Sequence, residues 1–258
     1  MVSSVVVIAG IGNGSGTGAA AARLFAKEGY SVALVSRGAE FLEGLAQAIN
    51  ASGGQASSFP VTSYGPEDLT AAFSSIQSRY PAPEYAITAA IYNAGHGVWK
   101  PFLDVTPQDI RESNTVNIEG SFAFARAAIL AFQKNELTQA TGARGTLVFT
   151  GATASLRGNV TTSAFAAGKF AVRALSQSLA KEFGKQNIHV AHAIIDGGIA
   201  TGNIRGNRDS KPSGAVENPT PDLKLSPESI AQSYLYLVNQ ERSAWTWELD
   251  LRPAHEKW

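Results

Sequence analysis

The chain contains no cysteine, which excludes a disulfide framework and any metal site built on thiolates. Its 4 histidines do not recur at the short spacings of histidine metal sites. Lysine plus arginine number 21, as do aspartate plus glutamate, so the formal net charge is zero. Such a balance does not favour a nucleic-acid or membrane-surface partner. We therefore expect no metal ion, no nucleic acid and no membrane among its partners.

Long apolar runs are also missing. No stretch approaches the ~20 residues that a membrane-spanning helix needs. Residues 1–5 lack a basic segment and lead directly into a short apolar run, which indicates a first strand rather than a signal peptide. Together with the lack of cysteine, these features lead us to expect a cytoplasmic protein. A length of 258 residues is ordinary for one α/β domain, so we expect a single domain over 1–258.

Short apolar runs alternate with amphipathic segments of helix length. We expect strands over 5–9, 31–36, 56–61, 85–91, 146–150, 188–195 and 245–251. We expect helices over 19–28, 40–50, 66–79, 108–134, 164–183 and 227–239. This order predicts an α/β fold, a doubly wound and mainly parallel seven-stranded Rossmann-type sheet with helices on both faces. The irregular stretch 202–225 is interpreted as a lid over the substrate.

Glycine occupies every second position from Gly10 to Gly18, directly after the first expected strand. Glycine permits a tight turn and lets backbone N–H groups approach a pyrophosphate at a helix N-terminus. The pattern G-x-x-x-G-x-G fits two registers, one starting at Gly10 and one at Gly12. We prefer the second, because small residues follow its last glycine. The dinucleotide-binding residues expected in this turn are Gly12, Asn13, Ser15, Gly16, Thr17 and Gly18.

The second expected strand ends at Ser36 and is followed by Arg37. An acidic residue there would accept hydrogen bonds from the ribose hydroxyls of NAD. The guanidinium of Arg37 is instead suited to a 2′-phosphate. The sequence therefore predicts NADP(H) as the cofactor.

Several segments in the same order resemble the motifs of the short-chain dehydrogenase/reductase family, over nearly the whole chain. The glycine turn, the segment from Tyr92 to Gly95, Asn117, and the segment from Asp196 to Thr201 carry this resemblance. Tyr92 replaces the first asparagine of the family's Asn-Asn-Ala-Gly turn, and Asp196 replaces the proline of its Pro-Gly motif. The resemblance implies further cofactor contacts from Val61, Asn93, Ala94, Gly95, Lys169, Ile199 and Thr201.

The active-site pattern Tyr-x-x-x-Lys of the family falls on the segment from Phe165 to Lys169. The lysine is retained, but Phe165 stands at the place of the tyrosine that protonates a carbonyl oxygen as hydride arrives. Ala152 stands at the place of the family's serine, with Thr153 beside it. Because phenylalanine has no proton to give, unassisted ketone reduction is expected to be poor. We expect the catalytic set to be Asn117, Lys169, Phe165, Ala152 and Thr153, with the first two orienting the nicotinamide ribose and water.

Three functions are consistent with this pattern. The first is an NADP(H)-dependent oxidoreductase that reduces an iminium, an activated alkene or a carbonyl, with His96, Asp196, Tyr92 or Thr153 as alternative proton donors. The second is a non-redox cyclase or isomerase, since some fungal relatives without the tyrosine act as imine reductases and Diels–Alderases. The third is a non-catalytic NADP(H)-binding protein. We favour the first.

The substrate is expected to be a small molecule. Its expected pocket contains His96, Trp99 and Asp196, which follow the fourth and sixth strands. The resemblance also implies a homodimer or homotetramer, formed through the long helices around Asn117 and Lys169.

Overall fold

The computed structural model describes residues 2–201 and 223–255. Its strands form one sheet in the order β3-β2-β1-β4-β5-β6-β7, and all neighbours are parallel. The strands are β1 (Ser3–Ala9), β2 (Ser31–Ser36), β3 (Gln55–Pro60), β4 (Tyr85–Tyr92), β5 (Gly145–Thr150), β6 (Ile188–Ile195) and β7 (Glu248–Leu251). The order reverses between β1 and β4, which creates the crevice where ligands bind in such sheets. The predicted doubly wound parallel fold is confirmed.

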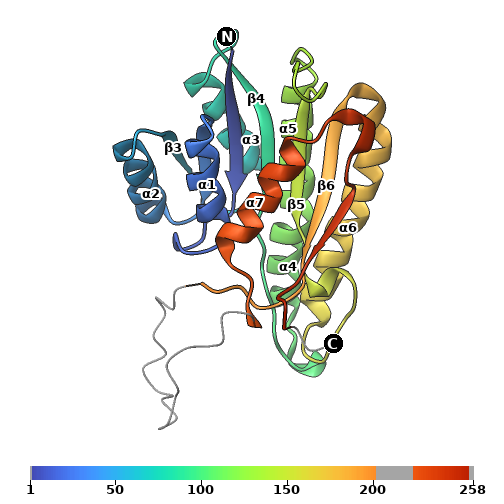
Figure 1. Cartoon of the computed structure of the whole chain (residues 1–258). Coiled ribbons are helices and arrows are strands. Elements are labelled where there is room, and N and C mark those ends of the chain that lie inside the picture. The colour runs from blue at the N-terminus through green and yellow to red at the C-terminus, as the bar shows by residue number, and fades with distance from the viewer. Residues whose placement is uncertain (1, 202–222, 256–258) are drawn as a thin grey trace.

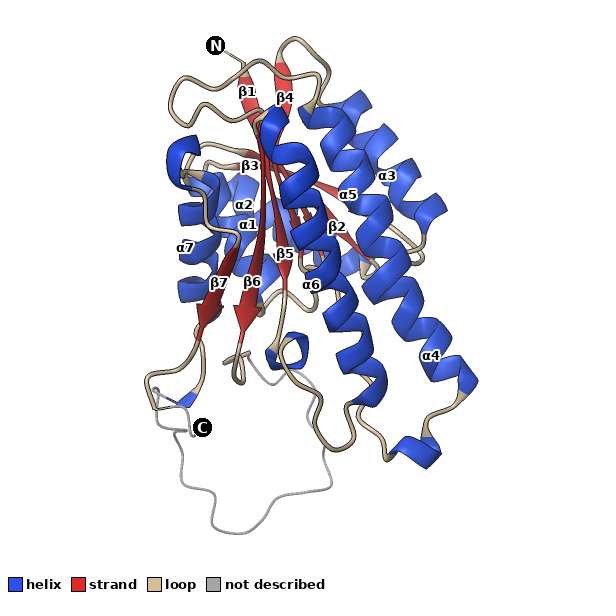
Figure 2. Cartoon of the chain, turned by 90° about the vertical axis from the view of Figure 1, so that its right-hand side faces the viewer, coloured by secondary structure: helices blue, strands red, loops and turns tan. Residues whose placement is uncertain are grey.

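Helices cover both faces of this sheet (Figures 1 and 2). One face carries α1 (Thr17–Lys27), α2 (Ala39–Ala51) and α7 (Pro227–Val238). The other carries α3 (Pro66–Arg79), α4 (Pro107–Asn114), α5 (Gly120–Phe132) and α6 (Ser163–Phe183). None of the helices in the described ranges has the length and apolar character needed to cross a bilayer.

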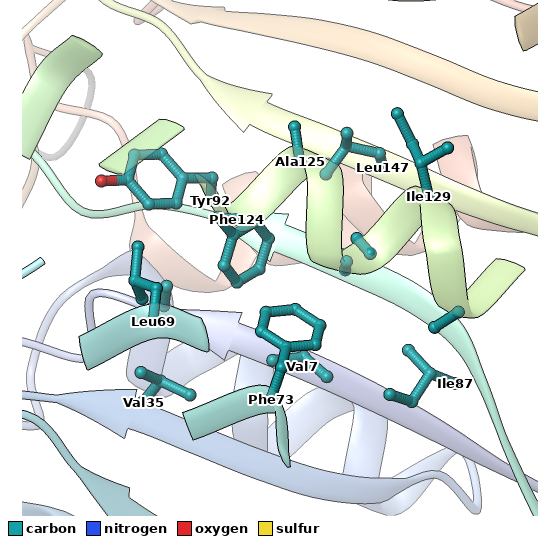
Figure 3. Packing of buried hydrophobic residues seen from close by; sticks show 14 of the residues in the cluster. Val7, Val35, Leu69, Phe73, Ile87, Tyr92, Phe124, Ala125, Ile129 and Leu147 are labelled. Atoms are coloured by element: carbon teal, nitrogen blue, oxygen red, sulfur yellow. The ribbon is translucent and has the colours of Figure 1, made fainter. Parts of the chain in front are cut away.

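Apolar side chains fill the space between the sheet and each helical layer. Figure 3 shows the layer under α3 and α5, where Phe73 and Phe124 face each other above Val7 of β1. The two rings meet edge to face, with centroids 5.3 Å apart. Full burial of such a side chain stabilises the fold by roughly 1.5–3 kcal/mol. This packing fixes the ends of the strands from which the crevice is built.

The prediction of one continuous helix over 108–134 is wrong in one respect. The chain forms α4, then a π-helical turn at Thr115–Glu119, then α5. Directly after this turn the helix packs closely on the sheet, since a Cβ atom on Gly120 would lie 2.4 Å from the Tyr92 hydroxyl oxygen. Such π-turns often occur at functional positions, and this one contains Asn117.

The C-terminal strand is shorter than predicted. The range 245–251 was expected to be one strand, but β7 begins at Glu248. Trp245 instead stacks on His189, with ring centroids 4.9 Å apart and an interplanar angle of 6°. Of the lid predicted over 202–225, residues 202–222 lie outside the described part of the chain. Leu225, at the end of that range, forms a parallel bridge with Ile199.

Candidate active site

A cavity of about 1140 Å³ opens at the carboxyl ends of the central strands. Its wall includes Gly10 after β1, Arg37 after β2, Asn93 after β4, Thr150 at the end of β5 and Ile195 at the end of β6. Parallel strands all end at one edge of the sheet, so residues far apart in the sequence meet there. This is the usual ligand site of a doubly wound sheet.

Two glycines allow three segments to meet at the floor of the cavity. A Cβ atom on Gly10 would lie 2.3 Å from the backbone nitrogen of Ala94, and one on Gly18 would lie 2.3 Å from the carbonyl oxygen of Gly10. Gly10 also has a φ of +95°, and its carbonyl accepts a hydrogen bond of 2.7 Å from Asn93 Nδ2. The register preferred in the sequence analysis begins at Gly12 and therefore leaves out Gly10. The position of Gly10 directly after the first strand could have indicated its role.

The N-terminus of α1 faces the cavity without a side-chain cap. Gly16 is the N-cap residue, and the part of the chain that the structure describes provides no side-chain cap to this helix. The Thr17 hydroxyl is buried and has no hydrogen-bond partner among the described residues. Free N–H groups and the helix dipole make such an end a binding site for anions. These groups fit the pyrophosphate of a dinucleotide.

Arg37 lies at the β2 end of the cavity, over the ring of Tyr64 at 5.3 Å from the ring centre. The Tyr64 and Ser36 hydroxyls are hydrogen-bonded at 3.1 Å, and burial raises the pKa of Tyr64. Arg37 forms no ion pair within the described part of the chain. Its charge is therefore available to an anionic group of a ligand. The sequence analysis missed Tyr64, which lies in a loop with no periodic signal.

Lys169 of α6 lies at the other end of the cavity and is 5 % exposed. Its Nζ donates a hydrogen bond of 2.8 Å to the Thr150 carbonyl. Burial lowers the pKa of Lys169 to about 8, because a dry environment disfavours the charged form. A Cβ atom on Gly95 would lie 3.4 Å from this Nζ, so the turn after β4 closes over the ammonium group.

Phe165 and Trp99 provide an aromatic wall beside Lys169. Their ring centroids are 5.4 Å apart, and the Trp99 side chain is 67 % exposed. Ala152 and Thr153, which follow β5, line the same cavity. Neither aromatic side chain carries an acidic proton, so this wall provides apolar contact rather than acid catalysis.

Thr153 connects the cavity to a buried ionic cluster. Its hydroxyl donates a hydrogen bond to the Asp196 carboxylate, which is 1 % exposed. The other partners of this carboxylate are the guanidinium groups of Arg157, at 3.4 Å, and Arg252, at 2.6 Å. The ionic contacts account for the burial of a charge, which is costly unless it is paired.

Asn117 lies inside the protein and positions the turn after β4. Its Nδ2 donates to the His96 carbonyl at 2.9 Å and to Ser113 Oγ at 3.0 Å, while its Oδ1 accepts from the His96 N–H at 3.1 Å. The His96 imidazole lies 3.7 Å from the Glu112 carboxylate. Asn117 thus acts on the cavity through the backbone that it holds.

The expected site residues divide into two groups. Those that line the cavity are Gly12, Asn13, Gly16, Thr17, Gly18, Ser36, Arg37, Asn93, Ala94, Gly95, Trp99, Ala152, Thr153, Phe165, Lys169, Ile199 and Thr201. The expected residues that are not among those lining the cavity are Ser15, Val61, His96, Asn117 and Asp196. Asn13 Oδ1 accepts hydrogen bonds from the Ser15 backbone and hydroxyl, which shapes the glycine turn. Across the described residues, no group of three or more His, Asp or Glu is placed to hold a metal ion.

Tyr92 is not available as a proton donor to this cavity. Its side chain is fully buried, and its hydroxyl donates a hydrogen bond of 2.5 Å to the Val116 carbonyl. Burial raises its pKa far above the ordinary value. The sequence-based suggestion that Tyr92 replaces the missing acid is therefore wrong.

Comparison with known proteins relates the chain to oxidoreductases. The family model for short chain dehydrogenases matches residues 4–212. A 3-oxoacyl-[acyl-carrier-protein] reductase of Bos taurus is 29 % identical over 195 residues, 76 % of this chain and 76 % of the relative. An A-factor type gamma-butyrolactone 1′-reductase of Streptomyces virginiae is 28 % identical over 242 residues, 90 % of this chain and 88 % of the relative.

Solved structures have the same architecture. The crystal structure of a short-chain dehydrogenase from Rhodopseudomonas palustris superposes with a TM-score of 0.76 at 30 % sequence identity. The match covers 97 % of this chain and 98 % of the other. The likeness thus extends over the sheet, both helical layers and the strand ends that form the cavity.

Proposed function

The chain belongs to the short-chain dehydrogenase family of oxidoreductases, and from this membership we propose that it is an NADP(H)-dependent oxidoreductase with a non-standard active site. Its substrate is a small organic molecule that exchanges hydride with the cofactor. The observation that carries the proposal is one cavity with the N-terminus of α1 and Arg37, which has no ion pair among the described residues, at one end and the buried Lys169 at the other.

The cavity residues fit a dinucleotide with a phosphate on its adenosine ribose. The first turn of α1, with the unpartnered Thr17 hydroxyl, would hold the pyrophosphate. Arg37, stacked on Tyr64, would bind the 2′-phosphate. Asn93 and Lys169 would hold the nicotinamide end. The bound nicotinamide would supply or accept the hydride.

Lys169 is our candidate for the proton donor that replaces tyrosine. Of the described residues on the cavity wall, the titratable ones are Arg37, Tyr64 and Lys169, and the first two lie at the β2 end. An ammonium group with a pKa of about 8 is largely protonated at pH 7 and gives up its proton readily. His96 and Asp196 are not among the residues that line the cavity, and the Thr153 proton is directed to Asp196.

The charge of Lys169 also discriminates among hydride acceptors. A buried cation stabilises negative charge that develops on a substrate oxygen and repels a substrate that is itself a cation. We therefore favour a carbonyl or an activated alkene over the iminium that the sequence alone left open. Both curated relatives described above are reductases by name, which supports the reductive direction.

The proposal is tested by titrating the purified protein with NADPH, NADP⁺ and NADH, followed by absorbance assays with ketones, enones and imines. We expect NADPH to bind at least tenfold more tightly than NADH, and NADPH to be consumed with a ketone or an enone. Product formation without loss of NADPH would indicate the cyclase or isomerase alternative. Tight binding with no turnover would indicate a binding protein, and no binding of either coenzyme would refute the proposal.

We further propose that the partner of this chain is a second copy of itself. Phe122 and Leu130 of α5 and Phe170 of α6 expose large apolar surfaces on the same helical layer. Clusters of exposed apolar residues on folded proteins often mark association surfaces. The arrangement supports a dimer or tetramer formed through α5 and α6.

A further inference from the structure

The Thr153 hydroxyl has a defined direction. Its proton points to Asp196 Oδ1, whereas its oxygen belongs to a residue on the cavity wall. A hydroxyl group has one donor and two acceptor sites. With the donor used inside the protein, the lone pairs of the oxygen remain for the cavity.

The surroundings of Asp196 hold this direction fixed. The Asp196 carboxylate lies between the guanidinium groups of Arg157 and Arg252, which can only donate hydrogen bonds. Its Oδ1 accepts the hydrogen bond of the Thr153 hydroxyl. Reversing the Thr153 hydroxyl would therefore leave two oxygens facing each other in a buried place, which is unfavourable.

Lys169 of α6 provides a hydrogen-bond donor in the same cavity. Its ammonium is bound to the carbonyl of Thr150, the last residue of β5, and Thr153 follows in the segment that leaves this strand. A donor and a fixed acceptor thus belong to the same cavity wall. The apolar wall of Trp99 and Phe165 lies in the same cavity.

We propose that Thr153 is a specificity-determining residue that accepts a hydrogen bond from a hydroxyl on the carbon next to the reacting carbonyl. The substrate class is then an α-hydroxy ketone with an apolar group, reduced to a vicinal diol. This inference rests on the proposed function. Hydride from a reduced nicotinamide dinucleotide adds to the carbonyl carbon, the C=O π bond breaks, and the oxygen takes a proton from Lys169, which solvent restores.

The test uses α-hydroxyacetophenone and its methyl ether, α-methoxyacetophenone, as matched probes. The two ketones share the ring and the carbonyl, but only the first has a hydroxyl proton. Binding of each to protein saturated with NADP⁺ is measured by calorimetry. We expect the hydroxy ketone to bind about tenfold more tightly, because the ether leaves the Thr153 acceptor without a donor.

Two variants assign this selectivity to Thr153. Thr153→Val keeps the shape of the side chain and removes the oxygen, so the ratio of the two affinities is expected to fall to about one. Thr153→Ser keeps the hydroxyl and is expected to keep the preference. Thermal unfolding checks that both variants are folded, and Thr153→Ala serves in the same role if the valine disturbs the fold.

Turnover with NADPH gives a second readout. In Thr153→Val, we expect KM for the hydroxy ketone to rise by a larger factor than KM for the ether, with little change in kcat for the hydroxy ketone. Equal affinity of the wild type for both ketones, selectivity that persists without the hydroxyl, or no binding of either ketone to the NADP⁺ complex would each overturn the inference. Failure of NADP⁺ itself to bind would instead overturn the proposed function.

Discussion

The ammonium group of Lys169 lies 5.9 Å from the centre of the Phe165 ring, one helical turn away on α6. Residues four apart on a helix are neighbours on its surface, and a cation over an aromatic face is attracted to it. The Phe165 ring thus lies beside the Lys169 ammonium group, where a tyrosine at this position would place its hydroxyl. Around this pair, the cavity combines a buried cation with an apolar wall.

Restoring the hydroxyl is the most direct test of this arrangement. We predict that Phe165→Tyr raises kcat/KM for reduction of acetophenone by NADPH, by roughly 10²-fold, the lower end of what general acid catalysis contributes. The wild type, which has the same ring without the hydroxyl, is the matched reference, and Phe165→Leu is the control for changing this side chain without adding a hydroxyl. If the tyrosine variant gains nothing while it still binds NADPH, the site lacks more than one proton donor.

The pH dependence reports on Lys169. Because its pKa is about 8 in the folded protein, we predict that kcat for ketone reduction falls as the pH rises through 8. Lys169→Arg is expected to abolish this fall, since arginine stays protonated. A wild-type profile that is flat from pH 7 to 9.5 would exclude Lys169 as the acid.

The lowered pKa of Lys169 also affects the stability of the fold. The folded pKa is below the ordinary value of 10.5, so between pH 8 and 10.5 the unfolded chain binds more protons than the folded one. The contribution of Lys169 to the free energy of unfolding therefore rises with pH across this window. Lys169→Met should lack this rise in denaturant titrations at pH 8 and 10.

Coenzyme selectivity depends on Arg37 and on the ring beneath it. We predict that Arg37→Ala weakens NADPH binding by roughly 10- to 100-fold, as expected for loss of a charge-assisted hydrogen bond, and leaves NADH binding nearly unchanged. Tyr64→Leu should weaken NADPH binding a few-fold, since the stacking contact is lost. Tyr64→Phe keeps the ring and is the matched control. Equal losses for both coenzymes in Arg37→Ala would contradict the assignment.

The oligomer is tested on α5. We predict that Phe122→Glu shifts the sedimentation coefficient of the protein to that of a smaller species, because a charge would be buried without a partner at the interface. Phe122 is 55 % exposed in the single chain, so the substitution should be tolerated by the fold itself. Gln77→Glu on the exposed side of α3 adds a charge elsewhere and should have no effect. A monomeric wild type would contradict the proposal.

Local patterns were sufficient to predict the fold. The strand expected over 188–195 coincides with β6, because a mainly apolar run of strand length, interrupted only by His189 and His192, has few other solutions between polar segments. The π-helical turn between α4 and α5 was not predictable in this way. The close approach of Gly120, which follows it, to Tyr92 at the end of β4 joins segments far apart in the sequence and is likewise seen only in the structure.

Those residues of the candidate site that belong to recognisable sequence motifs could be predicted. The glycine turn, Arg37, Phe165 and Lys169 each follow a recognisable strand or helix signal, and the structure brings them to one cavity. The Thr153–Asp196 hydrogen bond joins residues 43 apart in sequence. No local pattern shows which of two distant polar residues donates to the other, so this relationship emerges only from the three-dimensional structure.

Arg252 follows the last strand of the sheet, yet its guanidinium lies 2.6 Å from the carboxylate that orients Thr153. The segment that follows β7 thereby helps to hold the Thr153 hydroxyl in its orientation. Replacing Arg252 would remove a counter-charge from that carboxylate while the described cavity-lining residues stay unchanged. Changes at this end of the molecule should therefore register as altered substrate preference.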